Sequence, residues 1–366
     1  MLMIKLKTPE EGAILSQWTA DQKELLEKYL LSADKVGGFE EADTNQDAEL
    51  VGDWLKLLMT DGLDFSFPGK ILLSWEERGK DKGKNFFAEL SESSFFRQKM
   101  TFHPGKRGNK IFVHSLKNGT KYFWRIGYTA KTGKIKYSPV SFFHTEEIFP
   151  RWIGIGGGSN IRDIGGKMTI YGKKIRQGLF YRGCALNKSI TVPGESLDFL
   201  MENLHIKSDL DTRASDGESG KAFPGKKVRY FNIPLRAYGN IFTPEQSANY
   251  AKAFRVLTEK RNLPSYTHCL GGADRTGCFI FLVCALLGME EKDLLFDYEA
   301  TSVFSRFRGK RYRSTAYFQS FMQGLKDLAG ENGGKMTVQA LAENYFLKGG
   351  ITEKEINKLR KLFLED

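Results

Sequence analysis

Cysteine and histidine are scarce in this chain, and their scarcity limits the chemistry it can carry. Its 366 residues include four cysteines and five histidines. Four of the histidines are scattered without metal-ligand spacing, namely His103, His114, His144 and His205. The cysteines have neither the density nor the spacing of a disulfide framework, and none forms a Cys-x-x-Cys pair; they are Cys184, Cys269, Cys278 and Cys284. The sequence therefore predicts no metal site and leaves the redox compartment open.

Long hydrophobic runs are also absent. The first residues, MLMIKLKTPEEG, lack the apolar core of a signal peptide, and no run approaches the roughly 18 apolar residues of a membrane span. The most apolar segment, GCFIFLVCALLGM at residues 277–289, is apolar on nearly every side. This pattern predicts a buried central helix rather than a membrane segment. We expect no transmembrane segment in the chain.

The chain has no excess of negative charge. Its net charge of +11 indicates an anionic partner, which could be a phosphorylated substrate, a nucleic acid or an acidic membrane surface. Hydrophobic residues make up 41% and charged residues 27%, which is the composition of a folded globular protein. The length favours two domains over one.

The N-terminal part has the pattern of a β-rich domain. Strand-like segments such as ILLSWEE and TKYFWRIGYTA alternate with turns over residues 70–143. Residues 17–31 and 47–59 have helical spacing instead. We expect a β-sandwich with a helical insert over residues 1–148.

The C-terminal part alternates strand and helix patterns. The segment GIGGGSNIRDIGG, residues 154–166, lacks the Gly-x-Gly-x-x-Gly spacing of a dinucleotide site. Strand patterns near residues 180, 208, 229 and 265 then alternate with helical patterns at 195–203 and 244–257, and residues 291–366 are mainly helical in pattern. The alternation predicts an α/β domain over residues 149–366, with a parallel-type sheet flanked by helices.

One cysteine lies in a glycine-rich segment between a predicted strand and a predicted helix. In THCLGGADRTG, residues 267–277, the strand ends at His268 and the helix begins near Thr276. Cys269 is thus expected at the carboxyl edge of the sheet, where open α/β folds bind ligands. Inward-pointing N–H groups and a helix N-terminus bind an anion and stabilise a thiolate there. The expected substrate-binding residues are Leu270, Gly271, Gly272, Ala273 and Gly277.

The side chains around this cysteine have predicted roles. Cys269 is the expected nucleophile, with a lowered pKa. Arg275 can bind two phosphate oxygens with its planar guanidinium, and Thr276 can donate a hydrogen bond to the thiolate. His268 is expected to orient the loop rather than to act as a base. The alternative is a buried structural cysteine in a glycine turn.

The pattern His-Cys, five residues, Arg-Thr is the signature of the cysteine-dependent protein tyrosine phosphatase superfamily, which this segment resembles. Three further segments narrow the resemblance to the bacterial and fungal tyrosine phosphatase family 3 type. They are NIRDIGG at 160–166, LFYRG at 179–183, and Asp211-Thr212-Arg213 with Glu218. The resemblance covers roughly residues 150–364. It implies two-step phosphomonoester hydrolysis without metal or cofactor, with phosphotyrosine protein as the favoured substrate.

The position of a general acid is a departure from the pattern of this superfamily. Many members carry an aspartate in the loop that corresponds to IPLRAYGNIFTP, residues 233–244, which contains no acid here. The resemblance makes Asp274 the preferred substitute, and a structural hydrogen bond to backbone is an equally open role for it. Family members often have lysine in place of Ala273. Other candidates for the acid are Asp211, Asp216 and Glu218.

The N-terminal domain resembles fibronectin type III domains. The resemblance depends on Trp75, on the strand segment that includes Tyr122, and on Ser138 with Phe143. It implies a binding or spacing role, so a protein partner is one expectation and a structural appendage is the other. It also favours an extracytoplasmic location over a cytoplasmic one.

A basic and aromatic segment, FSRFRGKRYRS, spans residues 304–314. No nucleic-acid recognition fold accompanies it, so we expect no nucleic-acid partner. It is either a solvated helix end or a guide for an acidic phosphosubstrate; its basic residues are Arg306, Arg308, Lys310, Arg311 and Arg313.

Two further functions stay open at this point. A phosphoinositide or inositol phosphate phosphatase is favoured by the basic segment and by the missing loop acid. A binding protein of another class, an adaptor for phosphoproteins with weak catalysis, would use the same anion pocket.

Overall fold

The structure, a computed structural model, describes residues 2–36, 67–79, 82–104, 108–186, 192–214, 228–303, 311, 313 and 315–366. Several predictions concern residues outside these ranges. They are the helix at 47–59, the acid candidates Asp216 and Glu218, and the basic residues Arg306, Arg308 and Lys310.

The chain divides into two compact units. One comprises Met1–Thr19 with Pro68–Arg151, and the other comprises Ala20–Phe67 with Trp152–Asp366. The helix α1, Ala20–Val36, therefore belongs to the second unit, whereas the sequence interpretation placed it in the first domain. The boundary at residues 148 and 149 stays a prediction.

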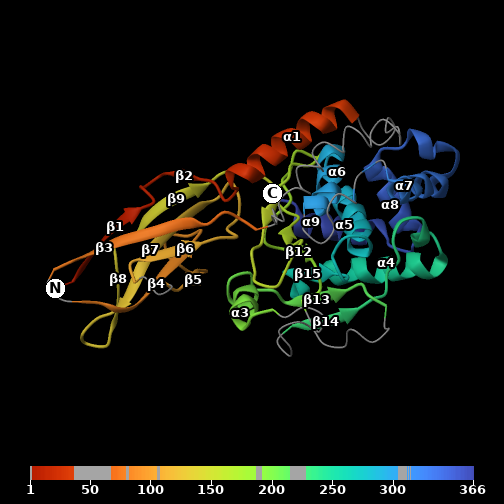
Figure 1. Ribbon diagram of the computed structural model, residues 1–366. Coiled ribbons are helices and arrows are strands. Elements are labelled where there is room, and N and C mark those ends of the chain that lie inside the picture. Colours follow the sequence, from red (N-terminus) through yellow and green to blue (C-terminus); the bar gives the residue numbers. More distant parts are fainter. Residues whose placement is uncertain are drawn as a thin grey trace. The chain divides into compact units, whose positions relative to one another are not determined.

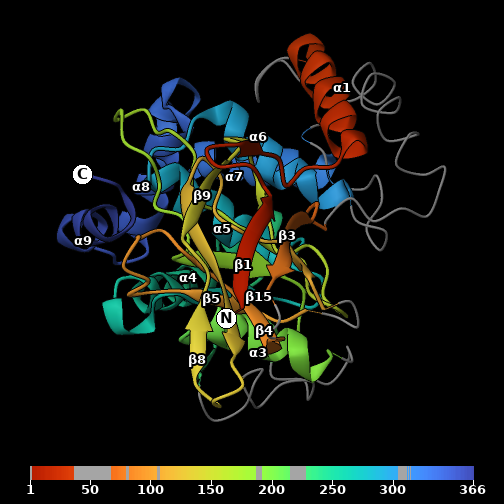
Figure 2. The ribbon, with the colours of Figure 1, turned by 90° about the vertical axis from the view of Figure 1, so that its left-hand side faces the viewer.

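The first unit consists of strands in two sheets, several of which can be followed in Figure 2. Tyr122 is buried, and its hydroxyl accepts a hydrogen bond from the backbone amide of Lys117 at 2.9 Å, as a corner tyrosine does. The resemblance to fibronectin type III domains stays a prediction.

The first sheet of this unit has the strand order β1 (Met3–Thr8), β3 (Ile71–Arg78), β6 (Lys110–Val113). The second has the order β2 (Ile14–Leu15), β9 (Ser141–Thr145), β7 (Lys121–Thr129), β4 (Lys84–Ser91), β5 (Met100–Phe102), with β8 (Ile135–Tyr137) paired to β7.

A mainly parallel sheet forms the centre of the second unit (Figure 1). Four strands pair in parallel, and this confirms the predicted α/β sheet with its strands near residues 180, 208, 229 and 265. The full strand order is β10 (Arg151–Trp152), β11 (Arg162–Asp163), β12 (Phe180–Gly183), β15 (Ser265–His268), β13 (Ser208–Asp211), β14 (Arg229–Asn232). β15 lies between β12 and β13, and their carboxyl ends reach the same edge because Gly183 and Asp211 both pair with His268.

Helices cover both faces of this sheet, since neighbouring strand residues point to opposite sides. Phe180 joins a large apolar cluster with α4 (Pro244–Leu257), α5 (Arg275–Leu286), α7 (Ala316–Ala329), α8 (Val338–Lys348) and α9 (Glu353–Phe363). The next residue, Tyr181, joins a smaller cluster with α3 (Gly194–Glu202). Every residue of α5 after Arg275 is buried, which confirms the predicted central helix. None of the described helices is long and apolar enough to cross a membrane.

A buried ionic network ties α1 to the last residue of α6 (Glu291–Glu299) and to Arg313. The Tyr29 hydroxyl donates to Glu299, and Arg313 binds both oxygens of that carboxylate at 2.9 Å. Arg313 also contacts the Tyr29 hydroxyl at 3.0 Å. Burial of an ion pair requires partners of this kind for every charged group, so these three side chains hold one another in place.

Truncating the central helix should cost far more stability than truncating an exposed position. Leu282 on α5 is fully buried, so Leu282→Ala is expected to lower the free energy of unfolding by about 2–5 kcal/mol. Leu347→Ala is the matched control, because that side chain is 38% exposed. Denaturant unfolding of both variants measures the difference, and equal losses would contradict the assigned burial.

Candidate active site

The loop Cys269–Asp274 connects β15 to α5 at the carboxyl edge of the parallel sheet. Gly272 has φ +69°, and a Cβ on it would lie 2.2 Å from the carbonyl oxygen of Gly183. The position therefore needs glycine both for its backbone angle and for its contact with β12. The loop is pressed against the end of the neighbouring strand.

Three loop carbonyls are bound from outside the loop. Asn160 Nδ2 donates to the Gly271 oxygen at 2.9 Å, Arg182 donates to the Gly272 oxygen, and the Ala185 amide donates to the Leu270 oxygen at 2.9 Å. In a trans peptide the N–H of the following residue points opposite to the carbonyl. The amides of Gly271, Gly272 and Ala273 therefore point to the inner side of the loop, as an anion site requires.

A single carboxylate holds the two arginines that brace this loop. Asp297 Oδ1 binds Arg162 Nε at 2.6 Å, and its Oδ2 binds Arg182 Nη1 at 2.6 Å. Both guanidinium groups are fully buried, and Arg162 also donates to Asn160. Burial alone would raise the pKa of Asp297, but the two arginines lower it by a larger amount, so the net shift is downward. The residues of the NIRDIGG segment thus brace the loop.

Cys269 is buried, with 3% of its surface exposed. Burial raises the pKa of its thiol, whereas the Thr276 hydroxyl, the charge of Arg275 and the Thr276 amide lower it, and the net shift is downward. The buried Thr276 hydroxyl has no oxygen or nitrogen partner among the described residues, so it can donate to the sulfur. Burial raises the pKa of the other three cysteines, Cys184, Cys278 and Cys284.

His268 is fixed between two acceptors. Its Nε2 lies 2.9 Å from Asp209 Oδ1, and its Nδ1 lies 2.9 Å from the Cys269 carbonyl oxygen. Burial lowers the pKa of His268, but the Asp209 and Asp211 carboxylates and the Cys269 carbonyl together raise it by more, so the net shift is upward. Thr212 binds the His268 carbonyl through its amide at 2.8 Å and its hydroxyl at 2.9 Å. These contacts suit an orienting residue better than a base.

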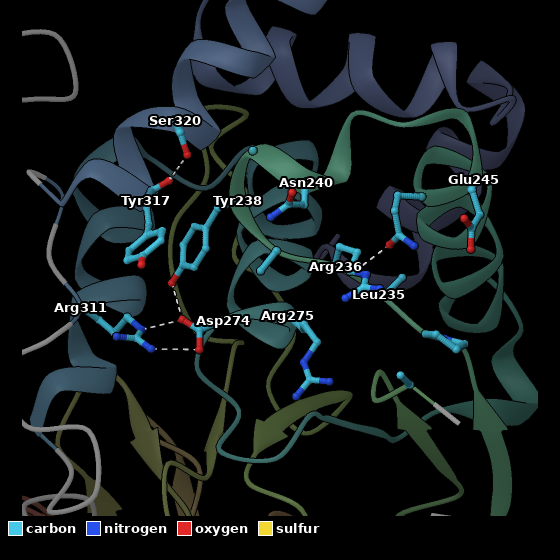
Figure 3. A pocket seen from close by; sticks show the side chains of 15 residues that line it. Leu235, Arg236, Tyr238, Asn240, Glu245, Asp274, Arg275, Arg311, Tyr317 and Ser320 are labelled. Atoms are coloured by element: carbon cyan, nitrogen blue, oxygen red, sulfur yellow. Dashed lines mark hydrogen bonds and ion pairs between the residues drawn. The ribbon is translucent and has the colours of Figure 1, made fainter. Parts of the chain in front are cut away.

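Arg275 begins α5 and lines a pocket of about 790 Å³ beside the loop (Figure 3). Within the described ranges its half-buried guanidinium makes no hydrogen bond and no ion pair. Arg236, Tyr238, Asp274, Arg311 and Tyr317 line the same pocket. The pocket thus offers arginine charge and an aromatic wall next to the loop that carries Cys269.

Asp274 is held by residues from outside the loop. Arg311 binds its Oδ1 through Nε at 2.7 Å and its Oδ2 through Nη2 at 2.9 Å, and the Tyr238 hydroxyl donates to Oδ1 at 2.5 Å (Figure 3). Tyr238 belongs to the short helix η2, Tyr238–Ile241, within the loop that lacks an acid. Both oxygens of Asp274 accept hydrogen bonds, which is the behaviour of a carboxylate.

The remaining predicted residues are distributed as follows. Leu270, Gly271, Gly272 and Ala273 form the loop, and Gly277 lies in the first turn of α5 against Arg182. Asp211 is buried and accepts hydrogen bonds from Arg213 and from Tyr230, so its oxygens are occupied. Among the described residues no group of three or more histidine, cysteine, aspartate or glutamate side chains could hold a metal ion.

Sequence reasoning missed three residues of the site, Asp209, Tyr238 and Asp297. It named Arg311 as part of the basic segment but missed its pairing with Asp274. Asp297 is far from the loop in sequence, and no local pattern marks it. Asp209 was detectable in part, since parallel strands with aligned ends bring neighbouring polar residues to one edge.

The family model described as "Tyrosine phosphatase family" matches residues 153–365, which is more than half of the chain. The chain therefore belongs to this family of cysteine-dependent phosphatases, and its second unit has the α/β phosphatase fold. No curated protein matches the chain.

Two solved structures are similar to it at low level. The core catalytic domain of the PP-IP phosphatase SIW14 from S. cerevisiae, in complex with citrate, is 21% identical, covers 39% of this chain and 79% of its own, and has a TM-score of 0.29. A second structure of the Siw14 catalytic core is 20% identical, covers 39% and 78%, and has a TM-score of 0.29. Similarity this low supports no conclusion about fold or function.

The lowered pKa of Cys269 predicts a pH-dependent reactivity. Its thiolate should persist below the ordinary thiol range, so alkylation should rise with pH through this lowered pKa and then level off. Thr276→Val removes the largest stabilising contact and should move that rise to higher pH. Mass spectrometry after iodoacetamide pulses measures the extent of alkylation at each pH. Cys184, Cys278 and Cys284 are internal controls, because their raised pKa values and burial should leave them unreactive. Equal alkylation of all four would contradict the assignment.

Proposed function

We propose that this chain hydrolyses phosphomonoesters through a phosphocysteine on Cys269, with phosphotyrosine protein as its preferred substrate. The observation that carries the proposal is the buried Cys269 thiol with a lowered pKa, in a loop whose amides point inward beside Arg275. A thiolate is the nucleophilic form of cysteine. Membership in the tyrosine phosphatase family supports the choice of tyrosine.

The proposed reaction has two steps. In the first, the Cys269 sulfur attacks phosphorus, the bond from phosphorus to the leaving oxygen breaks, and that oxygen takes a proton. In the second, water attacks the phosphocysteine, inorganic phosphate forms and the thiolate is regenerated. Arg275 and the amides of the loop hold the equatorial oxygens, and Thr276 stabilises the departing sulfur. His268 keeps the loop carbonyl of Cys269 in position.

Asp274 is the proposed proton donor of the first step and acceptor of the second. It lines the pocket next to Arg275, so a leaving oxygen in that pocket would be within its reach. Both of its oxygens accept hydrogen bonds from Arg311 or Tyr238, so Asp274 has no proton of its own to donate. The proton that it passes to the leaving oxygen in the first step therefore has to arrive on the singly protonated phosphate group of the substrate, and in the second step Asp274 takes a proton from the attacking water. A structural role for Asp274 is the alternative.

The wall of the pocket supports an aryl ester over an aliphatic one. The rings of Tyr238 and Tyr317 pack with their centroids 5.6 Å apart, and Tyr317 is 70% exposed. Exposed aromatic rings bind other rings by offset stacking. The rival substrate is a phosphoinositide or an inositol phosphate, which Arg236, Arg275 and Arg311 of the same pocket would favour.

The proposal extends to the rest of the chain. Residues 1–148 are proposed as a fibronectin type III-like domain that recruits a protein partner, and residues 149–366 as the catalytic domain. An extracytoplasmic location follows only from the fibronectin resemblance. The competing hypothesis is that the chain is an adaptor, which binds phosphoproteins in the same pocket with little turnover.

A substrate panel with Cys269→Ser as control tests the proposed function. Phosphotyrosine peptides should be hydrolysed with higher kcat/KM than phosphoserine peptides, phosphoinositides or inositol phosphates, and Cys269→Ser should abolish turnover. Released phosphate is the measurement. A preference for phosphoinositides would select the rival enzyme. Phosphopeptide binding without any turnover would select the adaptor.

The role of Asp274 has a separate test. Asp274→Asn should slow phenyl phosphate hydrolysis by about 10²-fold or more, because a poor leaving group needs a proton. The loss with p-nitrophenyl phosphate should be much smaller, since its leaving group is already a good one. Steady-state kinetics on both esters measure the ratio. Equal losses would reject the acid role and leave the structural one.

A further inference from the structure

Asp274 places a negative charge in a loop that has to hold an anion. Its charge opposes the Cys269 thiolate and is one of the influences that raise the pKa of this thiol. It would also repel a phosphate dianion bound by the neighbouring Arg275. Unit charges a few ångströms apart interact by kilocalories in a partly desolvated site, so this carboxylate needs compensation.

Only one of the two partners of Asp274 described above carries a charge. Tyr238 donates a neutral hydroxyl hydrogen bond, and burial raises its pKa, so it stays protonated. Arg311 binds both carboxylate oxygens at 2.7 and 2.9 Å in the planar two-point geometry that arginine forms with carboxylates. In Figure 3 the pair lies at one side of the pocket, and no dashed line joins it to Arg275.

Arg311 is held in place by its own backbone. Its amide donates to Ser302 Oγ at 3.0 Å, and that hydroxyl donates back to the Arg311 carbonyl at 2.7 Å. Its side chain is 19% exposed. Burial lowers the pKa of Arg311, but the contacts with Asp274 raise it by more, so the group remains charged. The positive charge opposite Asp274 is therefore permanent and fixed.

We propose that Arg311 neutralises the Asp274 carboxylate and thereby preserves the positive potential of the anion site formed by Arg275 and the Cys269 loop. The inference rests on the proposed function in taking Cys269 as the nucleophile. Arg311 is then a positioning residue that acts through Asp274, while Arg275 remains the ligand of the phosphate. This role explains why a loop with an aspartate next to its arginine can still bind an anion.

The other titratable groups near Cys269 do not supply this compensation. Arg275 is engaged by the anion itself. His268, whose pKa is raised, faces the Asp209 carboxylate, and Arg182 is paired with Asp297. The buried neighbours Cys184, Cys278, Tyr250 and Tyr266 have raised pKa values, so they stay uncharged near neutral pH. The balance between Asp274 and Arg311 thus sets the local charge.

A double-mutant cycle tests the proposal, with readouts that do not require turnover. In Arg311→Gln, the pH at which Cys269 becomes alkylated should rise, and protection of Cys269 by inorganic phosphate should weaken roughly tenfold. Asp274→Asn alone should neither raise the pH of Cys269 alkylation nor weaken the protection by phosphate. The double variant should behave like Asp274→Asn, because the charge that Arg311 compensates is gone. A double variant as weak as Arg311→Gln would overturn the proposal and make Arg311 a direct phosphate ligand.

Three control variants separate this role from general effects. Tyr238→Phe removes a hydrogen bond from Asp274 but no charge, and Arg311→Lys keeps the charge, so both should retain phosphate protection. Arg236→Gln removes another pocket arginine, whose side chain is exposed. If Arg236→Gln weakens the phosphate protection of Cys269, that weakening should persist when Asp274→Asn is added. Rescue of Arg236→Gln by Asp274→Asn would mean that only the net pocket charge matters.

Two outcomes keep this inference distinct from the proposed function. An unmodified protein whose Cys269 alkylates like an ordinary thiol, or which hydrolyses no phosphomonoester, would reject the proposed function itself. A reactive Cys269 that is unaffected by Arg311→Gln would reject only the role of Arg311. If Arg311→Gln does not fold, the double variant is compared with Asp274→Asn, and weaker phosphate protection in the double variant would overturn the proposal.

Discussion

The geometry of the site depends on the two ion pairs that the Asp297 carboxylate makes with the guanidinium groups of Arg162 and Arg182. Arg182 reaches the Gly272 carbonyl, and Arg162 holds Asn160, which reaches the Gly271 carbonyl. Without the carboxylate, two buried cations would face each other, at a cost of several kilocalories per mole. The orientation of the loop peptides, and so of their amides, follows from this cluster.

Among the described residues around the loop, the carboxylates are paired with cations, whereas Arg275 is left unpaired. Asp209 is matched by His268, Asp211 by Arg213, Asp274 by Arg311, and Asp297 by two arginines. Arg275 is the exception, since no hydrogen bond or ion pair joins it to the described part of the chain. A guanidinium that is left free beside inward-pointing amides attracts an anion of matching geometry. The proposed affinity of the site for phosphate therefore depends on the paired charges around the loop as much as on the unpaired guanidinium of Arg275.

Local pattern was sufficient to predict the parallel strands, the central helix and the position of the Cys269 loop between strand and helix, but not the residues that brace this loop. The apolar run at 277–289 and the strand signals near residues 180 and 265 were readable because burial and period are local properties. The glycine at 272 was recognisable as permissive, yet its contact with Gly183 required the pairing of β12 with β15. The pairing of Arg311 with Asp274 spans 37 residues, and the basic segment, for which a solvated helix end and a guide for an acidic phosphosubstrate were both open, gave no sign of this contact with the Cys269 loop.

The contact of Tyr29 with Glu299 and Arg313 changes where the catalytic unit begins. The segment matched to the phosphatase family starts at residue 153, but the partner that completes this buried ion cluster comes from α1. A fragment starting at residue 153 would lack both hydrogen bonds of Tyr29, the one to Glu299 and the one from Arg313, and Arg313 is two residues from Arg311. The helix α1 thus stabilises the phosphatase domain although it lies outside the residues that match the family.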